Sequence, residues 1–430
     1  MKTIKGITLA GCAILLALVI GCSKKQGAQA ISSGGVSITI LMGKPEVAAQ
    51  FEKMLADYGG KTGVKITMIP LAGQDAYEKM ITLYASGNAP SILMVGQEFE
   101  EFQDKFLDLT DTSLVERANE GTIDFVTRDG RVYGLPTTVE AYGIIYNPAT
   151  VRAALGDDVD PREIKTTSEL SRFFEALKAA GKGPFTLSPM DWSLGAHLSN
   201  TVYALQNESH EERHKFFEDL KSGSVSLSNN TVFNGWVDTL DVLLKYNIHA
   251  ASPLAPVYED GMLELATGDA AAWFMGNWAY PELAAIEKAD YQFIPVPVSN
   301  NPGDYGNGKI AIGVPSYWCV DKSGNSEAQQ KAALEFLSWF IETKEGQDYY
   351  VNELNFIPAY QGFEIEPADK MSAQIAAFLN TGNNLEWMNT YYPAGGFQIM
   401  GAAIQKYVGG VINRTQLAEE FEKYWKSIKD

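Results

Sequence analysis

The chain has 430 residues, 46% of them hydrophobic and 20% charged, and its formal net charge at pH 7 is −19. A chain of this length buries a large share of its surface on folding and favours two domains. Because nucleic-acid binding requires a basic surface against the phosphates, the acidic balance argues against DNA or RNA as a partner.

The N-terminus has the features of a targeting signal. Two lysines precede an uncharged apolar run at residues 7–20, shorter than the roughly 18 to 20 residues that a membrane-spanning helix needs. The run ends in Val-Ile-Gly-Cys, which resembles the bacterial lipobox, whose cysteine is lipidated and becomes the first residue. We therefore expect residues 1–21 to be a lipoprotein signal peptide, Cys22 to carry a lipid anchor and residues 22–36 to form a flexible tether. A cleaved signal with an incidental cysteine is the alternative.

Cysteine usage is compatible with this interpretation. Cys12 would leave with the signal peptide and Cys22 would be acylated, so that Cys319 would be the one cysteine left. No internal disulfide could then form, and a chain of this size does not need one. We expect an extracytoplasmic protein anchored to the cell membrane, in the periplasm or on the outer surface.

The mature chain begins with alternating strand and helix patterns. Apolar segments at residues 36–42, 64–69 and 91–96 predict strands, and residues 47–58 and 75–86 between them have helical spacing. A β-α-β-α-β start predicts an α/β fold with a parallel sheet, in which ligands bind beyond the carboxyl ends of the strands. The polar residues at these positions are Lys44, Glu46, Gln97 and Glu98.

The most specific catalytic pattern is HEERH at residues 210–214. On a helix, H-E-x-x-H places two imidazoles on one face with a glutamate as general base, as in zinc metalloproteases. A catalytic zinc helix is mostly buried, whereas this segment is charged on all sides. Ser209 and Glu212 have the spacing of a capping box. We interpret the segment as a solvated helix start and expect no metal site.

Two tryptophans lie in GDAAAWFMGNWAYPEL, residues 268–283. The pattern predicts a strand ending at a glycine, with Trp273 in the core. Trp278 follows the strand's carboxyl end and is expected to face a crevice, with Asn277 beside it. Aromatic faces stack on sugar rings while polar side chains bond the hydroxyl groups, so such a crevice would suit a carbohydrate. The alternative is ligand contact for Trp273 and packing in the core for Trp278.

Six landmarks follow the order of a known family. They are the lipobox, the β-α-β start and residues 133–147, 268–283, 291–298 and 313–360. Over essentially the whole mature chain they resemble extracellular solute-binding proteins of carbohydrate ABC importers, the family that includes maltose-binding protein. The resemblance implies a periplasmic-binding-protein fold, a Venus flytrap of two α/β lobes joined by a three-crossing hinge. Such a protein closes on its ligand, and the membrane permease recognises the closed form.

The resemblance also implies a division of the chain. The N-terminal lobe would comprise residues 37–140 and 295–325, and the C-terminal lobe residues 141–294 and 326–430. The three crossings would lie near residues 140–141, 293–296 and 322–327.

The same resemblance implies ligand-binding residues. Glu140 matches the family's hinge-strand glutamate, and a carboxylate in this apolar strand needs hydrogen-bond donors, for which we favour a ligand over an internal partner. Trp278 coincides with the tryptophan that relatives use as a sugar platform. The remaining positions are Lys44, Glu46, Gln97, Glu98, Asp191, Trp192, Asn277, Tyr317, Trp387 and Tyr391. Trp318 faces opposite to Tyr317 along a strand, and the sequence leaves open which of them sees the cleft.

The sequence thus predicts a non-catalytic, monomeric lipoprotein that binds a mono- or oligosaccharide without a cofactor and delivers it to the permease subunits of an ABC importer. One alternative keeps the fold but binds a non-sugar solute such as a polyamine. Another is a secreted hydrolase that uses zinc or an acid pair, whose separation in space the sequence does not reveal.

Overall fold

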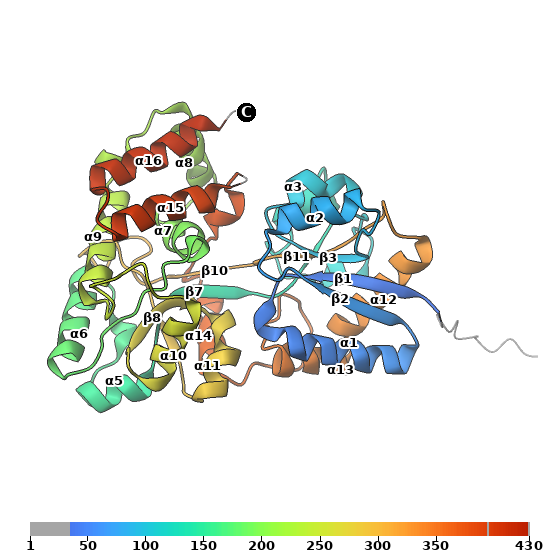
Figure 1. Cartoon of the computed structure of the whole chain (residues 1–430), viewed down its shortest axis with the longest axis horizontal. Helices are drawn as coiled ribbons and strands as arrows, with labels where there is room; N and C mark the ends of the chain where they lie inside the picture. The colour runs from blue at the N-terminus through green and yellow to red at the C-terminus, as the bar shows by residue number, and fades with distance from the viewer. Residues whose placement is uncertain (1–34, 394, 429–430) are drawn as a thin grey trace, which may run out of the picture.

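The computed structural model describes residues 35–393 and 395–428. The predicted signal peptide, Cys22 and nearly all of the predicted tether therefore lie outside the described residues. Among the described helices, none combines the length and the apolar character that a membrane crossing would require. Two five-stranded sheets organise the chain, one on each side of Figure 1, and we call them with their covering helices the first and the second lobe.

The first lobe is built on the sheet β2-β1-β3-β11-β6. Its strands are β1 (Ser37–Met42), β2 (Lys65–Pro70), β3 (Ile92–Val95), β6 (Leu135–Pro136) and β11 (Tyr317–Val320). Its helices are α1 (Ala48–Thr62), α2 (Ala76–Ala85), α3 (Phe99–Phe102), α4 (Ser113–Arg117), α12 (Glu327–Glu342) and α13 (Lys344–Asp348). β1 pairs in parallel with β2 and β3, which confirms the predicted β-α-β-α-β start, while β11 is antiparallel to β3. A small hairpin joins β4 (Thr127–Arg128) to β5 (Arg131–Val132).

The second lobe is built on the sheet β12-β10-β7-β8, with β9 also pairing with β7. Its strands are β7 (Glu140–Tyr146), β8 (Ala272–Gly276), β9 (Gln292–Ile294), β10 (Ile310–Gly313) and β12 (Asn384–Leu385). Its helices are α5 (Pro148–Leu155), α6 (Thr167–Ala179), α7 (Ser199–Ala204), α8 (His210–Ser222), α9 (Thr231–Tyr246), α10 (Tyr258–Thr267), α11 (Tyr280–Ile286), α14 (Lys370–Asn380), α15 (Gly396–Val408) and α16 (Arg414–Ser427). Every residue of β7 is buried, because neighbouring strands pair along both of its edges.

Short helical turns join these elements. They are η1 (Pro45–Val47), η2 (Gln103–Lys105), η3 (Asp124–Val126), η4 (Pro161–Glu163), η5 (Ser193–Leu198), η6 (Leu227–Asn229), η7 (Asn277–Ala279), η8 (Tyr349–Glu353) and η9 (Met388–Tyr391).

Helix starts follow local sequence chemistry. Asp75 caps α2, Thr166 caps α6 and Asn230 caps α9, each by accepting a hydrogen bond from a backbone N–H in the first turn. Ser209 caps α8 in the same way, and its partner is the amide of Glu212, so the predicted helix start in HEERH is confirmed.

Three chain segments connect the lobes. Residues 137–139 lead from β6 into β7, residues 314–316 lead from β10 into β11, and residues 354–369 lead from η8 into α14. Thr137 N donates to Ser316 O at 3.0 Å and Val139 N donates to Ile357 O at 2.9 Å, so the segments lie side by side. The predicted two-lobed fold with three crossings is therefore present.

Two parts of the predicted division need correction. Residues 295–325 are not all in the first lobe, because β10 pairs with β7 of the second sheet. Residues 326–430 are not all in the second lobe, because α12 packs on β1 and β11 and lies with α13 beside α1 (Figure 1). The chain consequently crosses at 314–316 and 354–369 instead of the two later predicted positions. An amphipathic helix pattern does not specify which sheet the apolar face will cover.

Candidate functional site

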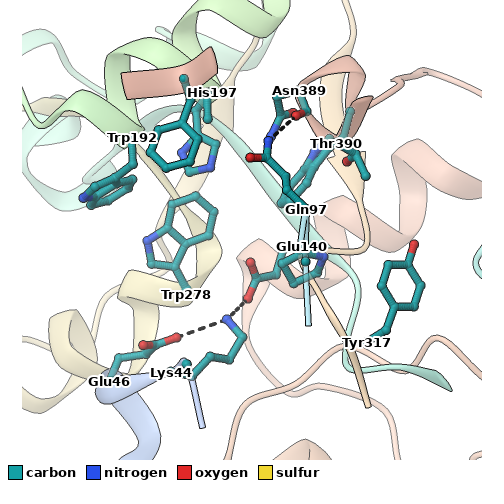
Figure 2. Close-up of a pocket in the computed structure, with 16 residues that line it drawn as sticks. Lys44, Glu46, Gln97, Glu140, Trp192, His197, Trp278, Tyr317, Asn389 and Thr390 are labelled. Carbon is teal, nitrogen blue, oxygen red and sulfur yellow. Dashed lines mark hydrogen bonds and ion pairs between the residues drawn. The ribbon is translucent and has the colours of Figure 1, made fainter. Parts of the chain in front are cut away.

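A cavity of about 320 Å³ lies between the lobes, and we call it the first cavity (Figure 2). On the first lobe, Lys44 follows the carboxyl end of β1 and Gln97 follows that of β3. Tyr317 begins β11, and it reaches the same edge of the sheet because β11 runs antiparallel and pairs Tyr317 with Val95. The first cavity therefore lies beyond the carboxyl ends of the parallel strands, where such sheets bind ligands.

A buried ion pair lies in the lining of the first cavity. The ammonium of Lys44 contacts the carboxylate of Glu140 and lies 3.1 Å from Glu46 Oε1. Lys44 and Glu140 are 8% and 5% exposed. Burial opposes the charge on Lys44, but the two carboxylates outweigh burial and raise the pKa of Lys44, which keeps the ammonium charged. Glu140 thus has an internal partner, which the sequence analysis had disfavoured, and it also lines the cavity.

Aromatic rings form the opposite side of the first cavity. The ring centroids of Trp192 and Trp278 are 6.2 Å apart, and the His197 ring lies 4.9 Å from Trp278. His197 also stacks on Tyr142 at 4.5 Å, and Tyr142 lies 4.9 Å from Trp387. Figure 2 shows Trp192, His197 and Trp278 grouped together, with Trp278 the nearest of them to Lys44 and Glu46.

Two glycines allow the tryptophans to lie against strand backbone. A Cβ atom on Gly276 of β8 would be 1.9 Å from the ring of Trp278, and one on Gly313 of β10 would be 2.5 Å from the ring of Trp387. Any larger residue would displace the rings, so these two strand glycines help to set the shape of the cavity.

His197 stays uncharged among these rings. Burial is the main cause that lowers its pKa from 6.5 to about 3, and the positive charge of Lys44 lowers it further. Within the described part of the chain, His197 Nδ1 and Trp387 Nε1 are buried atoms without a hydrogen-bond partner. Both residues line the first cavity, so each brings unused hydrogen-bonding capacity to its lining.

Besides the Lys44–Glu140 pair, a second side-chain hydrogen bond joins the two lobes within the lining. Gln97 Nε2 donates to Asn389 O at 2.8 Å, as Figure 2 shows. Asn389 in turn accepts from Tyr142 OH through Oδ1 at 3.0 Å, and its amide donates to Asn200 Oδ1 at 3.2 Å. The first lobe is thereby linked to a hydrogen-bonded group in the second.

Most of the residues singled out from the sequence come together in this cavity. They are Lys44, Glu46, Gln97, Glu140, Trp192, Trp278, Tyr317 and Trp387. The structure also decides between Tyr317 and Trp318, since Trp318 is 1% exposed and stacks on Phe51 at 5.8 Å. Trp273 is fully buried and donates from Nε1 to Ser188 Oγ at 2.9 Å, so its predicted place in the core is confirmed.

Four expected positions lie outside the lining of the first cavity. Glu98 turns back to accept from the amide of Gly96 at 3.0 Å, and burial raises its pKa. Asp191 accepts from the amide of Trp192 at 2.8 Å.

The other two positions have different neighbours. Asn277 Oδ1 accepts from the amide of Ala141 at 2.8 Å, so it supports the hinge strand β7. Tyr391 lines a second cavity, described below. The family resemblance indicated all four positions but not the direction of each side chain.

The sequence analysis did not identify other residues of the lining. His197 was not singled out, because a lone histidine in an apolar segment gives no indication of a cavity. Asn389 and Thr390 lie two and three residues after Trp387, so the expectation for that loop could have included them. Phe397 begins α15, where an aromatic side chain normally suggests core packing.

The second cavity has a volume of about 350 Å³ and shares Tyr317, Trp387 and Thr390 with the first. It too is lined by both lobes, with Asp124 from η3 on one side and Glu386 from the loop after β12 on the other. The space between the lobes thus extends past Trp387.

Comparisons with known proteins agree with this architecture. Residues 47–378 match the profile of the bacterial extracellular solute-binding protein family. A maltooligosaccharide ABC transporter solute-binding lipoprotein of Streptococcus pneumoniae is 22% identical over 379 residues, which cover 83% of this chain and 81% of the relative.

Solved structures show the same fold. The solute-binding protein RafE in complex with raffinose aligns with a TM-score of 0.76 at 18% identity, covering 91% of this chain and 99% of that one. Maltose-bound MalE3 of T. maritima aligns with a TM-score of 0.72 at 18% identity, covering 91% and 99%.

Proposed function

The chain belongs to the bacterial extracellular solute-binding protein family, and from that premise we propose that it captures a mono- or oligosaccharide between its lobes for an ABC importer. The observation that carries the proposal is the composition of the first cavity. Three tryptophans of the second lobe face charged and amide side chains at the strand ends of the first. Sugars need both kinds of surface, because their C–H faces stack on aromatic rings while their hydroxyl groups exchange hydrogen bonds.

Individual residues take distinct roles in this proposal. Trp278 is half-buried and supplies the platform on which a sugar ring stacks. Glu140 and Gln97 accept from and donate to hydroxyl groups, and the unpaired Nδ1 of His197 offers a further hydrogen bond.

The charges of the lining favour a neutral ligand over a polyamine. A polyamine would need carboxylates that are free to pair with its ammonium groups. Here both Glu140 and Glu46 already contact Lys44, so the lining offers a cation little additional attraction. An anionic ligand would be repelled by the same two carboxylates.

The proposal assigns a binding role rather than catalysis. The carboxylates of Glu46 and Glu140 hold Lys44 between them, and general acid-base hydrolysis would require one of them to carry a proton toward the substrate. The family match supports the same role, since its members bind solutes outside the cytoplasm.

Closure and delivery follow from the two-lobed architecture. Rotation about the three crossing segments would bring the two walls onto the ligand, and a permease would receive the closed form. The S. pneumoniae relatives are named ABC transporter solute-binding lipoproteins, which supports lipidation at Cys22, anchorage outside the cytoplasm and action beside permease subunits.

A thermal-shift screen tests the proposal. A ligand that binds only the folded protein stabilises it by about 2.7 kcal/mol at one hundred times its dissociation constant, which raises the melting temperature. We expect a shift with one or more of raffinose, maltooligosaccharides and chitin oligosaccharides, and none with spermidine. A shift with spermidine alone would replace the carbohydrate assignment with the polyamine alternative.

A further inference from the structure

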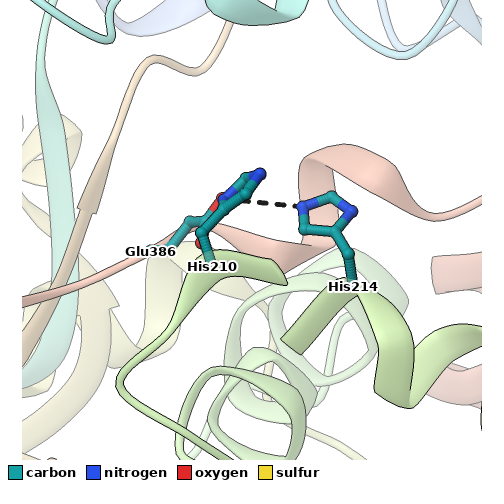
Figure 3. A group of neighbouring side chains, drawn as sticks. All are labelled: His210, His214 and Glu386. Carbon is teal, nitrogen blue, oxygen red and sulfur yellow. Dashed lines mark hydrogen bonds and ion pairs between the residues drawn. The ribbon is translucent and has the colours of Figure 1, made fainter. Parts of the chain in front are cut away.

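Beside the second cavity, which His210 and Glu386 line, lies a group of side chains that the proposed function does not use. His210 and His214 lie one turn apart at the start of α8, and Glu386 approaches both from the loop after β12 (Figure 3). Their potential ligand atoms all lie within 4.8 Å of one another. We propose that these three residues, the His-His-Glu triad, bind one divalent transition-metal ion of the zinc class.

The geometry of the triad suits a small ion. Glu386 Oε1 is 2.9 Å from His210 Nδ1 and 3.8 Å from His214 Nε2, so one oxygen faces both imidazoles. Bonds of roughly 2.0 to 2.2 Å in a tetrahedral zinc site separate neighbouring ligand atoms by about 3.3 Å. The present distances lie on both sides of that value, and small side-chain rotations would equalise them.

An unpaired atom points independently to a ligand. Within residues 35–393 and 395–428, the Nε2 atom of His214 is buried and has no hydrogen-bond partner, since 3.8 Å from Glu386 is too long for a hydrogen bond. A buried nitrogen without a hydrogen-bond partner destabilises the folded state. A metal ion between the three side chains would satisfy that nitrogen without moving the helix.

Arg213 holds the carboxylate in position. Its guanidinium contacts Glu386 Oε2 while donating to the backbone oxygens of Asn207 and Glu208, each at 2.8 Å. The outer oxygen is thus occupied, and Oε1 is left directed at the imidazoles. Outer hydrogen bonds of this kind fix the orientation of metal ligands.

The surroundings favour a cation over an anion. Asp124 and Glu120 of the first lobe line the same cavity as His210 and Glu386, so carboxylates stand on both sides of the open space. Two imidazoles with one carboxylate are ligands for zinc, cobalt or nickel, whereas calcium and magnesium prefer oxygen.

This site differs from a zinc protease centre. In a protease the glutamate after the first histidine is the general base, but Glu211 here accepts from Ser209 Oγ at 2.6 Å at the exposed helix start. The expectation of no metal rested on the charged surroundings of the helix start, and the sequence did not indicate that Glu386, distant in sequence, lies beside both imidazoles. The triad therefore supports binding of an ion and not hydrolysis.

Titration of the dialysed, tag-free protein with zinc chloride tests the proposal by calorimetry, with cobalt(II) absorption as a spectroscopic readout. We expect one equivalent of zinc to bind, no response to calcium or magnesium, and at least tenfold weaker zinc binding in His210→Ala and His214→Ala. His249→Ala is the matched control, because His249 Nε2 lies 2.6 Å from Glu264 Oε1 without a second imidazole.

The outcomes separate a bound ion from a structural cluster. Each variant is expected to keep the melting temperature of the native protein when zinc is absent, which verifies that the variant folds. If His214→Ala does not fold, His214→Gln takes its place. The proposal would be overturned if the native protein did not bind zinc stoichiometrically. It would also be overturned if both histidine variants bound zinc as tightly as the native protein does.

Discussion

The two walls of the first cavity differ in how their side chains are held. On the first lobe, Lys44 and Gln97 reach across the gap and pair with Glu140 and Asn389. On the second lobe, Trp278 and its neighbours are held by contact with other rings and by glycines in the strands beneath. The side formed by Lys44 and Gln97, the polar wall, therefore depends on partners across the gap. The side formed by Trp192, His197 and Trp278, the aromatic wall, is formed within one lobe.

The largest effect is expected when the polar wall loses its cation. Lys44→Met leaves Glu140 buried without its partner, and breaking a buried pair in this way lowers the free energy of unfolding by about 3 to 5 kcal/mol. Chemical denaturation measures the loss, and the double variant with Glu140→Gln should recover part of it.

A matched lysine pair distinguishes burial from charge. Lys53 pairs with Glu353 at 3.5 Å where both side chains are exposed, so Lys53→Met should change stability by about 0 to 1 kcal/mol. Equal losses in the two lysine variants would contradict the role of the buried pair.

The aromatic wall should show the opposite behaviour. Trp278→Ala removes the proposed platform but only a half-buried ring, so sugar affinity should fall about a hundredfold, or about 2.7 kcal/mol, with a smaller change in stability. Calorimetry of the sugar identified in the screen measures this loss. The control is Trp339→Ala, which removes a partly buried tryptophan on α12 outside both cavities and should bind the sugar normally. Normal sugar binding by Trp278→Ala would contradict the prediction and assign Trp278 to the core.

The uncharged histidine makes the aromatic wall sensitive to acid. The folded protein keeps His197 neutral to about pH 3, while the unfolded chain binds a proton near the ordinary pKa of 6.5. Stability present above pH 6.5 should therefore fall as the pH decreases from 6.5 to 3, by about 2 kcal/mol at pH 5. His197→Gln should lose this slope in denaturation curves between pH 7 and 5, and His249→Gln should keep it.

The smallest effect on sugar binding is expected from the hydrogen bond between Gln97 and Asn389. Gln97→Met removes one neutral hydrogen bond to Asn389 O, so sugar affinity should weaken about fivefold, or about 1 kcal/mol. Titration calorimetry would resolve this change. An effect as large as that of Trp278→Ala would mean that the polar wall dominates binding.

The same difference, between contacts formed locally and contacts formed across the gap, also explains what the sequence could predict. The β-α-β-α-β start, the cap at Ser209 and the turn before Trp278 depend on residues close in the chain, and all three are present. Periodicity and capping chemistry act over a few residues, so they are visible without a structure.

Partners across the cavity could not be predicted in this way. Lys44 and Glu140 are 96 residues apart, Gln97 and Asn389 are 292 apart, and His210 and Glu386 are 176 apart. These pairings depend on where the chain crosses between the lobes, and two of the three crossings lie elsewhere than expected. The sequence could therefore identify many lining residues but not the contacts between them.

Calorimetric titration of the tether-free protein with an oligosaccharide panel, alongside spermidine, tests the central claim most directly. The two-walled cavity predicts a single saturable site for at least one saccharide, with affinity reduced about a hundredfold in Trp278→Ala and unchanged in Trp339→Ala. Saturable binding of spermidine with no heat from any saccharide would contradict the account.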